Sequence, residues 1–153
     1  MASKFRVSLL LAAAALCAQA APAPAPVTVQ GAWARPIVPG QQSSGAYMTL
    51  TAREPLTLLG GESPAAGIVE IHQMKMEGDI MKMRAAEAVP LAPGKPLQLA
   101  PGGYHFMLMD LQDPFKAGTQ IPFTLRFRDA RGKVSTLQVR LPVQVAPPRA
   151  SRQ

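Results

Sequence analysis

The chain has 153 residues, of which 48% are hydrophobic, and it carries a formal net charge of +7 at neutral pH. A chain of this length supports one domain with a single core, which excludes a multidomain enzyme. Half of the basic residues outside the first 20 lie in the last 28 residues, where we interpret them as the solvated faces of the last strands and a polar tail rather than as the basic stripe of a nucleic-acid-binding protein. We therefore expect no nucleic-acid partner.

Residues 1–20 have the composition of an export signal rather than of folded protein. Lys4 and Arg6 precede an apolar run over residues 7–18, and a small-x-small pattern of the kind that signal peptidase cleaves ends at Ala20. The apolar run is shorter than the roughly 20 residues that a stable membrane-spanning helix needs. We therefore expect a signal peptide cleaved after Ala20 and a periplasmic protein without a stable membrane anchor.

Cys17 is the only cysteine of the chain, and it lies within the predicted signal. A lipoprotein whose lipid is attached to this cysteine would need a small residue just before it, and Leu16 fits that requirement poorly. The mature chain is then expected to contain no cysteine, which excludes disulfides, thiolate metal sites and cysteine nucleophiles. A blue-copper electron-transfer centre is excluded too, because it requires a cysteine thiolate.

The rest of the chain divides into a Pro/Ala-rich linker over residues 21–26, a folded domain over residues 27–145 and a flexible tail over residues 146–153. Within the domain, apolar and polar residues alternate with a period of two, which is typical of strands with one buried face. Turn signals rich in Gly, Pro and Asp separate these runs. We expect an all-β, antiparallel Greek-key sandwich or barrel, with Trp33 in its core. The clearest alternating runs are Val27 to Trp33, Phe123 to Phe127 and Leu137 to Leu141.

Methionine and histidine gather in one short part of the domain. Six of the eight methionines lie between residues 74 and 109, and both histidines, His72 and His105, lie in or beside the same stretch. Gly78-Asp79 fits the two-residue loop of a β-hairpin, and His72 would lie on one face of that hairpin in diagonal reach of Met83. The predicted register pairs Glu77 with Ile80, Met76 with Met81, and Met74 with Met83.

A third strand is expected to bring further donors to the same region. His105, Met107 and Met109 share one face of this strand, and its other face is already apolar. Neutral thioethers and imidazoles, without thiolates or carboxylates, suit Cu(I) better than Zn, Mg or Ca. Methionine also fills irregular cores, so the packing of a sandwich interior stays the alternative explanation. Metal binding is favoured because packing does not need a second apolar face. The residues of the first apolar face are Tyr104, Phe106 and Leu108.

Four of these residues follow the spacing H-x10-M-x21-H-x-M, and the blocks around them extend the pattern over nearly the whole domain. In these blocks the chain resembles the periplasmic copper chaperones of the PCu(A)C family. The four residues are His72, Met83, His105 and Met107. The matching blocks are Gly31-Ala-Trp-Ala-Arg35, Ala46-Tyr-Met-Thr-Leu50, Val69-Glu-Ile-His-Gln-Met-Lys-Met76, Met81-Lys-Met-Arg84 and Pro101-Gly-Gly-Tyr-His-Phe-Met-Leu-Met-Asp-Leu111.

The resemblance implies a cupredoxin-like β-fold and a His2Met2 site for Cu(I), with His72, Met83, His105 and Met107 as ligands. It implies a copper chaperone, not an enzyme, that supplies copper to the CuA centre of cytochrome c oxidase. Another periplasmic copper acceptor is the alternative partner. Some members of the family carry a His- and Met-rich tail with a Cu(II) site, but residues 145–153 contain neither residue. The other methionines would line the site or act as transient ligands during transfer: Met74, Met76, Met81 and Met109.

The same residues are compatible with three other functions. A periplasmic copper-buffering or resistance protein would use the same ligands but retain the metal. A non-metal β-sandwich interaction domain could use the methionine face as a protein interface. A redox enzyme that uses bound copper is a third alternative. If the histidines bind copper, affinity should fall below about pH 6, because only neutral imidazole is a ligand.

Overall fold

The computed structural model describes residues 26–149. The predicted signal peptide, most of the linker and the last residues of the tail lie outside the described residues. Within the described part, the regular structure consists of ten β-strands in two sheets, as the alternating pattern predicted. Between residues 26 and 149 there is no helix with the length and apolarity that crossing a membrane requires.

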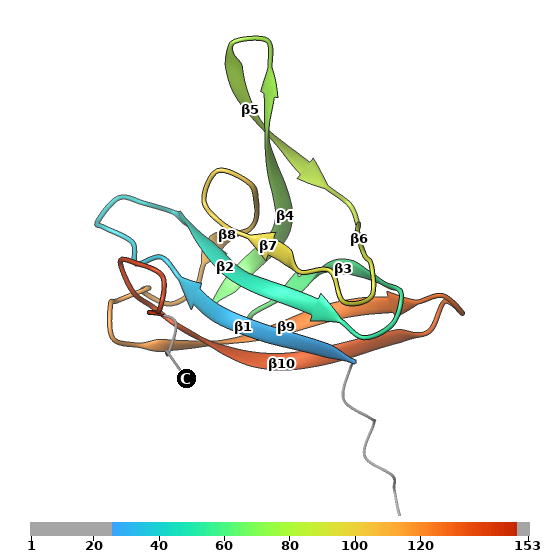
Figure 1. Cartoon of the computed structure of the whole chain (residues 1–153). Helices are drawn as coiled ribbons and strands as arrows, with labels where there is room; N and C mark the ends of the chain where they lie inside the picture. The colour runs from blue at the N-terminus through green and yellow to red at the C-terminus, as the bar shows by residue number, and fades with distance from the viewer. Residues whose placement is uncertain (1–25, 150–153) are drawn as a thin grey trace, which may run out of the picture.

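The larger sheet contains six strands, and it carries the predicted site. These strands are β1 (Val27–Ala34), β2 (Ser43–Ala52), β4 (Ala66–Glu77), β5 (Ile80–Ala86), β7 (Leu97–Leu99) and β8 (Tyr104–Leu111). Their order across the sheet is β1-β2-β7-β8-β4-β5, and β2 also pairs with β8 beyond the short β7 (Figure 1). Neighbouring strands run antiparallel, except for a parallel contact of β7 with β8 between Leu99 and Tyr104.

The smaller sheet lies against one face of the larger one. Its order is β10-β9-β3-β6, with all neighbours antiparallel. A parallel bridge between Ala34 and Val143 connects β1 to the residue that follows β10, so the two layers are joined along this side. The strands of the smaller sheet are β3 (Leu56–Glu62), β6 (Val89–Leu91), β9 (Gln120–Asp129) and β10 (Val134–Pro142).

The core fills the space between the two sheets. Phe106 of the larger sheet meets Phe123 of the smaller one edge to face, with ring centroids 5.0 Å apart. Along β9 the alternation predicted from the sequence is confirmed, because Phe123, Leu125 and Phe127 are all buried. On β8, Phe106 and Leu108 face this core. Side chains that alternate with them therefore lie on the outer face of the larger sheet.

Trp33 is buried, with 4% of its surface exposed, but it lies outside the core cluster in which we expected it. The cause is a β-bulge in β1, where the register shifts between Gln30 and Trp33. Gly31 sits in this bulge with φ of +59°, a conformation that glycine adopts without strain. The extra residue reverses the parity of the strand, so Trp33 pairs with Tyr47 on the outer face.

The β4–β5 hairpin extends beyond the body of the sandwich, where it forms an arm (Figure 1). Its register is the predicted one, with Glu77 opposite Ile80, Met76 opposite Met81 and Met74 opposite Met83. Gly78 in the loop has φ of +64°, as the hairpin assignment required. Strand β5 pairs with β4 on one side and forms the edge of the sheet.

Candidate metal centre

Strands β8, β4 and β5 bring the two histidines together. His72 of β4 lies directly opposite His105 of β8, and their ring centroids are 5.9 Å apart. On the other side of β4, Nδ1 of His72 lies 3.0 Å from Sδ of Met83 on β5. The diagonal contact between His72 and Met83 predicted from the hairpin register is therefore confirmed.

The second ring nitrogen of His72 is held by a carboxylate. Nε2 of His72 lies 2.8 Å from Oε2 of Glu70, two residues earlier on the same face of β4. A carboxylate accepts hydrogen bonds, so in the neutral imidazole Nε2–H donates to Glu70 and Nδ1 keeps its lone pair. That lone pair faces the sulfur of Met83. An imidazole nitrogen and a soft thioether sulfur turned toward each other are an arrangement that a shared metal ion can bridge.

His105 is oriented by the backbone and has the opposite ring assignment. Its Nδ1 lies 3.2 Å from the carbonyl oxygen of Gly103, which can only accept, so in the neutral ring Nδ1–H donates and Nε2 keeps the lone pair. Only 6% of the residue surface is exposed. Burial lowers the pKa of His105, the Gly103 carbonyl opposes this effect, and electrostatic interactions with His72 and Arg35 add to it. His105 is thus held as the neutral imidazole that metal ions bind.

A cleft of about 300 Å³ opens over this face. Met74 and Met83 of the hairpin line it together with His105 and Met107 of β8. Of the described residues that line the cleft, Arg35 alone carries a charge at neutral pH. Within the described part, no three side chains of His, Cys, Asp or Glu come together in the way that a hard or thiolate metal site needs. The donors present are therefore uncharged imidazole nitrogens and soft thioether sulfurs.

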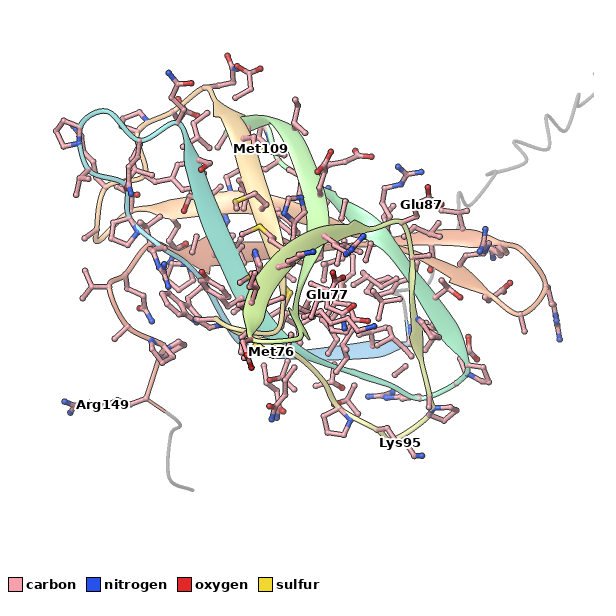
Figure 2. The ribbon with its side chains drawn as sticks, turned by 90° about the horizontal axis from the view of Figure 1, so that it is seen from above. Met76, Glu77, Glu87, Lys95, Met109 and Arg149 are labelled. Atoms are coloured by element: carbon pink, nitrogen blue, oxygen red, sulfur yellow. The ribbon has the colours of Figure 1, made fainter. Side chains whose placement is uncertain are left out.

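The remaining methionines of the predicted cluster lie at increasing distance from the cleft. Met76 and Met81 lie further out along the hairpin, and Met109 lies further along β8, opposite Ser43 of β2. Figure 2, which looks down on the hairpin, shows Met76 and Met109 well apart from each other. The sequence therefore predicted one methionine face, and the structure divides it into a cleft and two extensions.

Tyr47 of β2 completes the wall of the cleft, and Trp33 of β1 lies against it. The Tyr47 ring lies 6.3 Å from the His105 ring and 4.7 Å from the Trp33 ring, between centroids. Gly45 makes room for Tyr47, because a Cβ atom at this position would collide with the Tyr47 hydroxyl. Sequence reasoning missed Tyr47 as a wall residue because only non-local strand pairing brings β2 beside β8. Glu70 was missed too, although its parity with His72 was a readable signal.

The fold and the cleft together define a two-sheet β-domain that presents imidazole and thioether donors on one open face. The chain belongs to the LpqE-like family, whose model, described as "Putative lipoprotein LpqE-like", matches residues 27–143. A relative from Leifsonia xyli subsp. xyli, named "Putative lipoprotein Lxx21020", is 34% identical over 119 residues, which cover 77% of this chain and 69% of the relative.

Solved structures of copper-binding domains share the fold. Cu(I)-bound DR1885 from Deinococcus radiodurans is 34% identical, with a TM-score of 0.57, and the match covers 83% of this chain and 81% of that one. The copper-bound PCuAC domain of PmoF2 has a TM-score of 0.61 at 22% identity, covering 80% of this chain and 97% of the domain. The resemblance to the PCu(A)C family and the expected cupredoxin-like β-fold are thereby confirmed.

Proposed function

We propose that this protein is an exported copper chaperone that binds one Cu(I) ion through His72, Met83, His105 and Met107. Its acceptor in this proposal is the CuA centre of cytochrome c oxidase, and its compartment is the periplasm. The observation that carries the proposal is the contact of 3.0 Å between Nδ1 of His72 and Sδ of Met83. This contact lies at the cleft that Met107 and His105 also line.

The donor set supports Cu(I) as the cargo. Thioether sulfur is soft and neutral, and it does not compensate the charge of Zn²⁺, Mg²⁺ or Ca²⁺ as carboxylates and thiolates do. The 34% identical DR1885 has been solved in its Cu(I) form, which supports the same ion here. In an oxidising compartment, methionine also has an advantage over cysteine, because it does not form disulfides.

The shape of the site favours a carrier that releases its ion. Met83 is 47% exposed, and it belongs to an edge strand that an acceptor can approach. Methionine side chains are flexible, so an exposed thioether can be replaced by a ligand of the acceptor while the buried His105 still holds the ion. Cu(I) would then pass between proteins by successive ligand exchange.

Export is the proposed route to this compartment. Both the family description and the name of the Leifsonia relative refer to lipoproteins, which are exported proteins. For this chain we propose cleavage after Ala20 and release of a mature protein without lipid. Attachment of a lipid at Cys17 is the alternative, and it would change the anchoring without changing the copper site.

The experiment is an anaerobic Cu(I) titration of the exported protein against a competing chelator. One tight site should appear, and replacing His72 or His105 by glutamine, or Met83 or Met107 by leucine, should abolish it. Met109→Leu is the matched control, because Met109 lies on the same face of β8 as Met107 but two residues further along. Absence of a tight site in the unchanged protein would overturn the proposal.

Delivery needs a separate measurement. The Cu(I)-loaded protein is mixed with the copper-free CuA-bearing fragment of the oxidase, and the copper content of both is measured after separation. Transfer to the fragment is expected. A loaded protein that keeps its ion in the presence of the fragment would favour the copper-buffering function instead.

A further inference from the structure

The arm formed by the β4–β5 hairpin carries a second pair of thioethers outside the cleft. Met76 lies directly opposite Met81, one step nearer to the hairpin loop than the pair of Met74 and Met83. Both side chains are largely open to solvent, with 59% of Met76 and 51% of Met81 exposed. They form neither part of the core nor part of the wall of the cleft, so packing does not account for them.

These four methionines form a ladder on one face of the hairpin. Residues two apart along a strand share a face, and they are separated by about 7 Å. In a hairpin with a two-residue loop, the residues next to the loop, here Glu77 and Ile80, form a hydrogen-bonded pair. The following pair, Met76 and Met81, is therefore a non-hydrogen-bonded pair. In non-hydrogen-bonded pairs the two side chains lie closer to each other than in hydrogen-bonded pairs. Met76 and Met81 are therefore well placed to hold one small ion between two sulfur atoms.

The charged side chains that pair with one another in the hairpin lie on the face opposite to this ladder. Glu77 binds Lys82 at 2.9 Å and Arg84 at 2.6 Å, and all three belong to the parity that alternates with the methionines. The acidic side chain is thus neutralised on the far face, and its two cations are held there too. The methionine face offers sulfur without charge, which suits a soft monovalent cation and excludes hard divalent ions.

A surface role in packing or solubility does not explain this residue choice. Strand β5 is an edge strand, and exposed apolar residues on an edge promote unwanted strand pairing. Lys82 and Arg84 counteract that risk on one face, but Met76 and Met81 add to it on the other. Because Met76 and Met81 increase the risk of aggregation at the tip of the arm, we infer that they have a function there.

We propose that Met76 and Met81 form a second, weaker Cu(I) site at the tip of the arm, from which the ion reaches the cleft through Met74 and Met83. At each step one copper–sulfur bond forms while another breaks, the copper stays Cu(I), and no proton or electron is exchanged. Two thioethers bind more weakly than four donors, so the ion moves inward on uptake. This inference rests on the proposed function, because the ladder ends at its site.

The test uses protein labelled with ¹³C at the methionine methyl groups and titrated anaerobically with Cu(I). The first equivalent should shift the methyl signals of Met83 and Met107, and further Cu(I) should shift those of Met76 and Met81. In the double variant Met76→Leu/Met81→Leu the second step should be lost while the first remains. Release of Cu(I) from this variant to a chelator should also be slower at unchanged affinity of the inner site.

Ile80→Ala is the matched control. Ile80 is at least as exposed as the two methionines, at 63%, but it belongs to the opposite face of the hairpin. Its replacement therefore removes apolar surface without removing sulfur. The control should keep both binding steps and the release rate. If release slows in Ile80→Ala but not in the double leucine variant, the arm acts by apolar contact and the inference is wrong. The inference is also wrong if the first step occurs but the Met76 and Met81 signals never move. Failure of the first step in the unchanged protein would instead contradict the proposed function itself.

Discussion

The Glu70 carboxylate and the His72 imidazole form a pair in which Oε2 of Glu70 lies 2.8 Å from Nε2 of His72. The pair turns the other ring nitrogen, Nδ1, toward Met83. The ring of His105 is also oriented by a hydrogen bond, but its partner is a backbone carbonyl rather than a side chain. Only the orientation of His72 can therefore be changed by mutating its hydrogen-bond partner.

Replacing Glu70 by alanine should weaken Cu(I) binding. Loss of a residue that orients a metal-binding histidine costs about 10- to 100-fold in metal affinity, and we expect Glu70→Ala to fall in this range. Glu70→Gln can still accept the hydrogen bond from Nε2 and should recover part of the loss. NMR of the imidazole nitrogens in the copper-free protein gives an independent measure, because Glu70→Ala should mix the two tautomers of His72. Equal affinity in Glu70→Ala and the unchanged protein would show that the contact has no influence on the site.

Binding and folding should be separable by mutations on the two faces of β8. Met107→Leu keeps the side-chain volume, so it should abolish the tight Cu(I) site while lowering the free energy of unfolding by less than about 1.5 kcal/mol. Phe106→Ala empties a fully buried core position and should cost about 3–5 kcal/mol. Denaturant unfolding of the copper-free proteins checks both values. A large destabilisation by Met107→Leu would mean that Met107 is a packing residue.

Copper affinity should depend on pH through the histidines. Protons compete with Cu(I) for the imidazole lone pairs, so affinity should fall below about pH 6. Burial lowers the pKa of His105 from its ordinary 6.5, so this residue stays neutral, and able to bind, to lower pH than an exposed histidine. Affinity that stays flat between about pH 7.5 and about pH 5 would argue against histidine ligands.

The N-terminus of the exported protein should be tested directly, because the names of the family and of the relative refer to lipoproteins. Mass spectrometry of the exported protein should give a mature chain that starts at Ala21, without a lipid. A species that starts at a diacylated Cys17 would instead show the lipoprotein state that the names of the relatives indicate. Cys17→Ser separates the two cases, because it should leave processing unchanged in the first and block it in the second.

The sequence predicted the hairpin side of the site well. Gly78-Asp79 is a strong turn signal, and a two-residue loop allows one register, so the positions of Met74, Met83 and His72 followed from local rules. The alternation along β8 likewise placed Phe106 in the core and His105 on the outer face, as observed. Both predictions rest on contacts between residues close in sequence or on the parity of a single strand.

The parts that were not predicted depend on irregular or non-local structure. The bulge at Gly31 reverses the parity of β1, and nothing in the alternation of Val27 and Val29 announced that Trp33 would change face. Tyr47 reaches the cleft because β2 pairs with β8 across a long stretch of sequence. Orientation of an imidazole by Glu70 depends on side-chain rotamers, which a residue pattern does not specify.

Because Trp33 lies on the outer face, its fluorescence originates close to the proposed copper site. It is the single tryptophan of the chain, and its indole packs against the Tyr47 ring at an angle of 37°. The Tyr47 ring in turn lies 6.3 Å from that of His105. Only the Tyr47 ring thus separates the indole from His105. Because the indole lies next to the proposed copper site, we expect Cu(I) binding to change the intrinsic fluorescence of the unlabelled protein.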